Sequence, residues 1–228
     1  MNNLLKRLTS HLPLLWQQEL KRLMFRHEIR HQKFRSYEAE FLILGSMITA
    51  GDWVVDVGAN VGHYTKRFSD LVGPEGRVIA VEPVPETFEL LSANVLLFQH
   101  SNVTLLNVAA SDQPGVAGMQ IPRFETGLNN YYQANLSKGT ADIYVLTVRL
   151  DALACPHPIK LIKIDAEGHD PAVLRGAEAL LARDHPILIV ETGSSDVAEH
   201  LRRFGYTSER LPHSPNTLFR WSPRQTIE

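Results

Sequence analysis

The chain lacks the features that mark membrane-spanning and disulfide-rich proteins. It has 228 residues and one cysteine, Cys155, which excludes an intramolecular disulfide. No apolar run approaches the ~20 residues that cross a bilayer. The apolar stretch at residues 12–16 is too short for a signal-peptide core. We therefore expect a cytoplasmic protein, with Cys155 as a reduced, small apolar side chain.

The chain also lacks a strong overall charge, since 23 Lys and Arg against 25 Asp and Glu give −2. This balance argues against a general nucleic-acid binder. The charge is uneven, however: residues 1–35 carry a formal +6 and the remainder −8. A basic amphipathic helix here could contact a membrane surface or an acidic partner, or it could cap a cofactor cleft or form a homodimer arm, and the pattern favours the last two.

The most informative segment runs from Trp53 to Thr65 and reads WVVDVGANVGHYT. A short apolar run ends at Asp56, a glycine-bearing turn follows, and a helical pattern comes next. This order predicts a buried strand, a tight loop and a helix, which is where open α/β sheets bind nucleotide-like cofactors. Gly58 and Gly62 would let the backbone approach a ligand where a Cβ would clash.

A second acid lies at an informative distance from this loop. Residues 77–82 predict another buried strand, which ends at Glu82, twenty positions after Gly62. A carboxylate at that offset can accept hydrogen bonds from both hydroxyls of an adenosine ribose. Two strands, a glycine turn and a spaced acid together predict an adenosine-cofactor site.

The loop lacks the middle glycine of the dinucleotide motif G-x-G-x-x-G, because Asn60 stands between Gly58 and Gly62. That side chain would crowd a pyrophosphate. S-adenosylmethionine has no pyrophosphate, so Asp56 could face its ammonium and the loop amides its carboxylate. The chain also lacks a tyrosine followed four positions later by lysine, a common reductase dyad. The pattern therefore favours S-adenosylmethionine over a nicotinamide cofactor.

These motifs resemble those of the FkbM-type S-adenosylmethionine-dependent methyltransferases. The matching segments are 56–65, 76–83, 107–115, 162–169 and 173–177, in the expected order, and the resemblance covers roughly residues 38–192. The family often has glutamate where this chain has Asp170. The resemblance implies methyl transfer to a hydroxyl oxygen of a small molecule or glycan, such as a sugar or polyketide.

The predicted fold is α/β: a Rossmann-like, doubly wound, mostly parallel sheet with a C-terminal antiparallel hairpin and an N-terminal helical extension. We divide the chain into residues 1–48, the helical extension or cap, and residues 49–222, the Rossmann-like domain with an insertion at about 115–150. The polar loop 127–135 is either a site of acceptor recognition or a plain hairpin linker. One helix is expected from Asp170 or Pro171 to about Leu181.

Three polar residues lie at the end of the fourth predicted parallel strand, 160–165, and in the loop after it. Asp165 would line the cofactor and acceptor site, and Glu167 would orient the acceptor or pair with Lys163 or Arg175. His169 is the side chain best matched to a general base near neutral pH. With these three as catalytic candidates, the predicted cofactor-binding residues are Asp56, Gly58, Asn60, Gly62, Glu82 and Ala109, the last near the adenine edge.

Several alternatives stay open. Asp165 and Glu191, at the tips of neighbouring strands, could hold a divalent metal, although the sequence identifies no third ligand. The proline-rich Asp/Asn-Pro-Pro-aromatic loop of amino-directed nucleic-acid methyltransferases is absent, which favours an oxygen acceptor. The rival functions are a non-catalytic cofactor-binding partner of a biosynthetic complex and, less favoured, a nicotinamide-dependent reductase.

Overall fold

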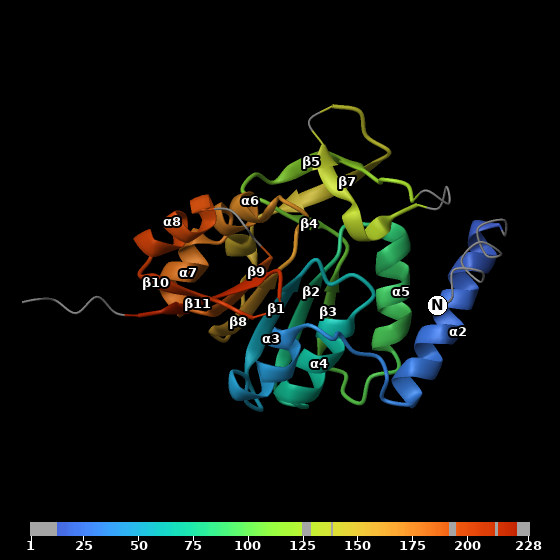
Figure 1. Ribbon diagram of the computed structural model, residues 1–228, viewed down its shortest axis with the longest axis horizontal. Coiled ribbons are helices and arrows are strands. Elements are labelled where there is room, and N and C mark those ends of the chain that lie inside the picture. The colour runs from blue at the N-terminus through green and yellow to red at the C-terminus, as the bar shows by residue number, and fades with distance from the viewer. Residues whose placement is uncertain (1–12, 125–128, 138, 192–194, 213, 223–228) are drawn as a thin grey trace, which may run out of the picture.

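The computed structural model describes residues 13–124, 129–137, 139–191, 195–212 and 214–222. Its centre is a seven-stranded sheet with the order β10-β11-β9-β8-β1-β2-β3 (Figure 1). The strands are β1 (Trp53–Val57), β2 (Arg77–Val81), β3 (Val103–Leu106), β8 (Ile159–Ile164), β9 (Ile187–Glu191), β10 (Tyr206–Arg210) and β11 (Asn216–Trp221).

Strand direction confirms the predicted fold class. Neighbouring pairs from β3 to β9 are parallel, whereas β11 is antiparallel to β9 and to β10. The strand order reverses on the two sides of β1, so the carboxyl ends of β1, β2 and β8 surround a crevice. The crevice of a doubly wound sheet is where the cofactor motifs were expected.

Helices cover both faces of the sheet because its buried strands are apolar on both sides. One cluster packs Val54, Val78 and Leu161 against the segments of α3 and α4. The alternate strand positions, such as Val55 and Ile162, pack against α6, α7 and α8. The helices are α2 (Leu14–Arg30), α3 (Ala39–Ile43), α4 (His63–Val72), α5 (Pro85–Val95), α6 (Asp170–Arg175), α7 (Glu178–Asp184) and α8 (Ser195–Arg203), with short 3₁₀ turns η1 (Leu44–Ser46), η2 (Tyr131–Gln133) and η3 (Leu150–Ala152).

A second sheet of four strands lies over the carboxyl end of the first (Figure 1). Its order is β4-β7-β5-β6, from β4 (Ala109–Ala110), β5 (Gly115–Gln120), β6 (Asn135–Ser137) and β7 (Ile143–Val148). One face carries an apolar cluster that joins it to Val84 after β2. Strands β5 to β7 thus lie within the predicted insertion, and the domain boundaries themselves stay a prediction.

The expectation of one helix from position 170 to 181 was wrong. Helix α6 ends at Arg175 and α7 begins at Glu178. Gly176, between them, lies against the backbone of Ser111, where a Cβ would be only 2.0 Å from the carbonyl oxygen. The close approach holds the break beside the second sheet, because Ser111 N donates to Val148 O of β7. No described helix is both long and apolar enough to cross a membrane.

Candidate functional site

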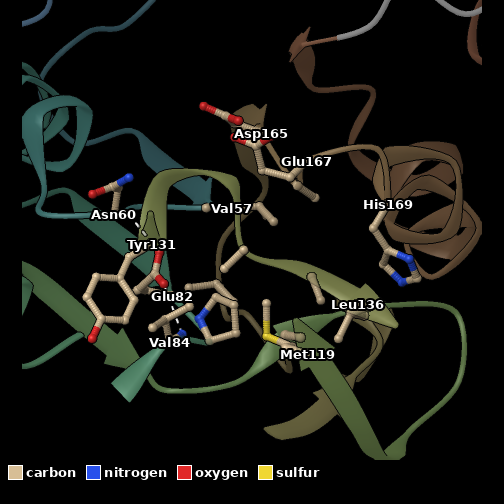
Figure 2. A pocket seen from close by; sticks show the side chains of 17 residues that line it. Val57, Asn60, Glu82, Val84, Met119, Tyr131, Leu136, Asp165, Glu167 and His169 are labelled. Atoms are coloured by element: carbon tan, nitrogen blue, oxygen red, sulfur yellow. Dashed lines mark hydrogen bonds between the residues drawn. The ribbon is translucent and has the colours of Figure 1, made fainter. Parts of the chain in front are cut away.

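A pocket opens at the carboxyl ends of β1, β2 and β8, beneath the second sheet (Figure 2). It encloses about 770 Å³ of space that is in part open to solvent. Among the residues that line it, those predicted from the sequence are Gly58, Asn60, Glu82, Ala109, Asp165, Glu167 and His169. The fold therefore brings together seven of the nine site residues predicted from the sequence.

The glycine loop owes its shape to close backbone approach. Gly58 has a φ of +73°, and a Cβ there would lie 1.9 Å from the carbonyl oxygen of Asp165. Asn60 also adopts a left-handed conformation, with a φ of +50°, and its Oδ1 accepts a hydrogen bond from Val61 N at 2.8 Å. Asparagine tolerates this conformation better than most residues because its amide bonds locally.

Glu82 links the second strand to the glycine loop. Its Oε2 accepts a hydrogen bond from Asn60 N, and its Oε1 accepts one from Val84 N, both at 2.9 Å. Burial raises the pKa of Glu82 to about 7, against the opposing effect of these two N–H donors. Each carboxylate oxygen still has a free lone pair, so Glu82 can accept further hydrogen bonds from ligand hydroxyls.

Asp56 and Gly62 do not line the pocket. Asp56 lies on the same strand face as Val54, so its fully buried side chain points toward α4, where Thr65 Oγ1 donates to Oδ2 at 2.6 Å. Its Oδ1 is buried without a hydrogen-bond partner among the described residues. Gly62 caps α4 with a φ of +100°. Both residues support the glycine loop from the side away from the pocket. Direct contact with a ligand in the pocket would need the loop to rearrange.

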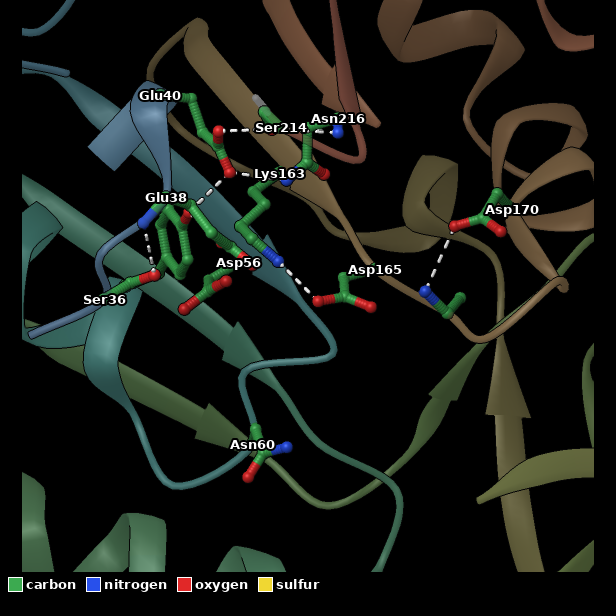
Figure 3. A network of polar contacts seen from close by, with 12 residues as sticks. Ser36, Glu38, Glu40, Asp56, Asn60, Lys163, Asp165, Asp170, Ser214 and Asn216 are labelled. Atoms are coloured by element: carbon green, nitrogen blue, oxygen red, sulfur yellow. Dashed lines mark hydrogen bonds and ion pairs between the residues drawn. The ribbon is translucent and has the colours of Figure 1, made fainter. Parts of the chain in front are cut away.

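Lys163 is the centre of a buried polar network (Figure 3). Its Nζ lies 2.9 Å from Asp165 Oδ2 and 4.6 Å from the ring centroid of Tyr64. The Tyr64 hydroxyl donates to Glu40 at 2.6 Å and contacts Glu38. Burial would lower the pKa of Lys163, but the surrounding carboxylates outweigh it and raise the pKa. The acid that pairs with Lys163 is therefore Asp165, whereas the sequence had offered Glu167 as a possible partner.

Three carboxylates meet at the rim of the pocket, because Asp165, Glu167 and Glu191 each offer an oxygen within 4.8 Å of the others. A hydrogen bond with Asp165, together with burial, raises the pKa of Glu191 to about 8. Glu191 thus holds its proton more tightly than an ordinary glutamic acid does, because it lies beside the Asp165 carboxylate. Glu167 supplies the third carboxylate that the sequence did not identify, so the three oxygens could hold a hard cation. The Lys163 ammonium already balances part of their charge.

His169 lies at the opposite end of the pocket from Tyr131 (Figure 2). Its Nε2 is 2.9 Å from Ser111 Oγ, and Ser111 lies beside Asp112, which pairs with Arg175 at 2.8 Å. Arg175 thus pairs with Asp112, whereas Glu167 was the expected partner. Burial lowers the pKa of His169, so its imidazole is neutral at pH 7 and can accept a proton.

The apolar wall of the pocket is the part that sequence reasoning missed. Met119 of β5 and Leu136 of β6 face each other across one antiparallel pair. Both line the pocket together with Val84, Tyr131 and Ala134. Tyr131 and Ala134 lie in the polar loop that was singled out. No sequence pattern pointed to Met119 and Leu136. They come together by strand pairing with sixteen residues between them, and such pairing leaves no mark on the local pattern.

The chain was compared with known families and solved structures. The model of the methyltransferase FkbM domain matches residues 56–208. The crystal structure of methyltransferase FkbM from Methylobacillus flagellatus KT superposes with a TM-score of 0.55 at 18% identity, covering 78% of this chain and 45% of that one. At this identity the superposition supports the fold alone.

Two curated relatives give partial alignments. Methyltransferase 1 of Beauveria bassiana is 27% identical over 146 residues, which is 55% of this chain and 58% of the relative. A protein-L-isoaspartate O-methyltransferase of Ignicoccus hospitalis is 32% identical over 66 residues, or 29% of this chain and 31% of the relative. The alignments thus span less than two thirds of either relative's length.

Proposed function

The chain belongs to the FkbM methyltransferase family, and we propose that it transfers a methyl group from S-adenosylmethionine to a hydroxyl oxygen of a small molecule or glycan. The family implies S-adenosylmethionine as the methyl donor and a methyl acceptor as the second substrate. The observation that carries the proposal is the single pocket shared by Glu82 and the glycine loop at one side and Asp165, Glu167 and His169 at the other.

Cofactor binding is assigned to the side of the pocket that holds the glycine loop. The Glu82 carboxylate accepts hydrogen bonds but donates none when ionised, which matches the two donors of a ribose diol. Its position is fixed by Asn60 N and Val84 N. Ala109, Met119 and Leu136 offer an apolar surface to an adenine ring. The acceptor carboxylate suits the ribose hydroxyls of an adenosine-bearing cofactor, and the apolar surface suits its adenine ring.

The acceptor is assigned to the side that holds the loop after β8. When bound, S-adenosylmethionine supplies an electrophilic methyl group, and the protein must align an acceptor oxygen with it and exclude water. The neutral imidazole of His169 accepts the hydroxyl proton, while Asp165 and Glu167 orient the acceptor by accepting hydrogen bonds. Ser111 Oγ, 2.9 Å from Nε2, holds the ring.

An oxygen acceptor is favoured over nitrogen by the loop after β8. Asp165-Ala166-Glu167-Gly168 supplies carboxylates and an adjacent imidazole, which suit deprotonation of a hydroxyl. The proline-rich aromatic loop typical of nucleic-acid amino methylation is absent from the sequence. The O-methyltransferase named among the relatives points the same way, over a short alignment.

Calorimetric titration with S-adenosylhomocysteine tests the cofactor site first, with NAD as the matched negative control. We expect micromolar binding of S-adenosylhomocysteine and none of NAD. Radiolabelled S-adenosylmethionine incubated with panels of sugars, polyketides and amines then tests the acceptor. Label transferred to hydroxyl compounds supports the proposal, and label found only on amines contradicts it. A protein that binds the cofactor and labels no acceptor would fit the non-catalytic partner.

A metal-assisted variant of the same reaction rests on one observation, the three carboxylate oxygens of Asp165, Glu167 and Glu191 within 4.8 Å. A divalent ion held there would bind the acceptor oxygen and lower its pKa. We expect cofactor binding to be indifferent to EDTA in either case, because this cluster lies at the rim. Loss of turnover in EDTA, restored by magnesium, would establish the variant.

A further inference from the structure

Helix α2 has two apolar stripes on opposite sides, and only one is covered. The inner stripe contains Gln18, Phe25 and Ile29, which are all buried. Phe25 packs edge-on against Phe34 and His63, and the helix lies along α5 at the periphery of the molecule (Figure 1). This stripe accounts for how the helix attaches to the domain.

The outer stripe consists of Trp16, Leu20, Leu23 and Met24. Their exposed fractions are 65%, 43%, 61% and 37%. The spacing of four, seven and eight residues from Trp16 places these side chains on one helix face, and that face lies opposite the inner stripe. No described residue covers them, although neighbouring Leu15 is also exposed. Clustered exposed apolar side chains of this kind mark an interaction surface.

Basic side chains border the outer stripe. Arg26 and Arg30 are exposed and form no ion pair with any residue that the structure describes. Of the two acids on the helix, Glu19 is neutralised by Arg22, and Glu28 is half-buried. The surface is therefore apolar with an uncompensated positive border, at the end of a chain whose residues after 35 carry a formal charge of −8.

We propose that the outer stripe of α2 binds an anionic membrane surface, with the helix lying in the plane of the headgroups. Tryptophan and leucine on one face with arginine and lysine beside them are the features of an interfacial helix. A second copy of this chain is the rival occupant. A parallel two-fold dimer through the stripe would place Arg26 and Arg30 of each copy near the same residues of its partner, where like charges would repel, whereas an antiparallel dimer would separate them. The oligomeric state is therefore part of the test.

Vesicle sedimentation with the full chain tests this inference. We compare vesicles of phosphatidylcholine alone with vesicles that also contain phosphatidylglycerol. The protein is expected to sediment with the anionic vesicles at least about tenfold more strongly, and added salt should weaken the binding. The intrinsic fluorescence should shift to the blue on binding. This shift should be reduced in Trp16→Phe, because Trp53 and Trp221 remain outside the stripe.

Three variants assign the binding to the surface. Leu20→Asp with Leu23→Asp should reduce sedimentation at least about tenfold, and Arg26→Glu with Arg30→Glu should abolish the preference for anionic vesicles. Leu146→Asp is the matched control, because Leu146 is 58% exposed in β7 of the second sheet. It should leave binding unchanged. Circular dichroism melts and S-adenosylhomocysteine titration show that each variant retains its fold.

Three outcomes overturn the inference. The first is a full chain that shows no preference for anionic vesicles. This outcome counts against the inference even if a chain without residues 1–12 does bind them. The second is equal loss of binding in Leu146→Asp. The third is a dimer in analytical ultracentrifugation that Leu20→Asp with Leu23→Asp converts to monomer, since a second copy would then cover the stripe. None of these outcomes bears on cofactor binding.

Discussion

Glu82 Oε2 accepts a hydrogen bond of 2.9 Å from the backbone N–H of Asn60. One contact thus ties the acid after β2 to the middle of the glycine loop after β1. The two residues are 22 positions apart in the chain, and parallel pairing of β1 with β2 brings them together. The loop and the acid line one pocket, so we expect a change in either of them to alter the affinity for the cofactor.

Replacing Glu82 with alanine should weaken S-adenosylhomocysteine binding by roughly 1–3 kcal/mol, because the ribose hydroxyls would lose a charged acceptor. Isothermal titration calorimetry measures the change. Glu75→Ala, an exposed acid in the turn before β2, is the control and should bind as the wild type does. Unchanged affinity in the Glu82 variant would remove this residue from the site.

The affinity for S-adenosylhomocysteine should rise with pH through about 7, the pKa to which burial raises Glu82. Hydroxyl donors favour the ionised carboxylate, so binding lowers this pKa and releases a proton. Below about pH 7 the affinity should fall by up to about tenfold per pH unit. Calorimetry in buffers of different ionisation enthalpy counts the proton released. A pH-independent affinity that Glu82→Gln leaves unaltered would contradict the assignment.

Replacing His169 with glutamine should lower turnover by roughly 100- to 10,000-fold, as expected for the loss of a general base. Cofactor affinity should stay intact, since the residue lies at the acceptor side. Ser111→Ala should cause a smaller loss and move the pH–rate profile, because the 2.9 Å contact to Nε2 orients the ring. His200→Gln, on α8, serves as control. Undiminished turnover in the His169 variant would transfer the role to Asp165.

Replacing Gly58 with alanine should destabilise the protein more than the same change at Gly51. Both glycines have positive φ, so each variant has a strain cost of about 1–3 kcal/mol. A Cβ at Gly51 meets no atom within 4 Å, whereas one at Gly58 lies 1.9 Å from the Asp165 oxygen. The clash should add about 1–3 kcal/mol. Urea unfolding of the two variants gives the difference, and equal values would refute the proposed close approach.

Replacing Lys163 with methionine should destabilise the fold by roughly 3–5 kcal/mol, because buried Asp56 and neighbouring Asp165 would lose their cation. Acid should reduce the loss, since protonation of the carboxylates removes the unpaired charge. Lys66→Met breaks an exposed pair with Asp70 and should cost about 0–1 kcal/mol. Denaturant unfolding at two pH values checks both. A Lys163→Met variant as stable as the wild type would show that the fold does not depend on this network.

Much of the fold was predictable because its signals are local. Apolar runs ending at Asp56, Glu82 and Asp165 predicted three neighbouring parallel strands, and the structure places them side by side. Glycine and proline indicated the turns, whereas the closing hairpin was expected from the Rossmann-like fold that the resemblance implies. Helix α7 was not predictable as a separate element, because the break at Gly176 depends on Ser111, which is 65 positions away along the chain.

The candidate site was predictable in its backbone motifs and less so in its side chains. The sequence alone determined which loops form the candidate site, because the spacing of Gly58, Gly62 and Glu82 is set by one strand–loop–helix unit and the strand that follows it.

Only the tertiary structure decided that Asp56 faces α4, since a strand buried on both sides gives no sign of which face holds a given residue. It also decided the apolar wall of Met119 and Leu136, and the contact of His169 with Ser111. These arrangements depend on pairings between segments that are far apart in the chain. Such pairings exist only once the sheets have formed, so no local sequence pattern predicts them.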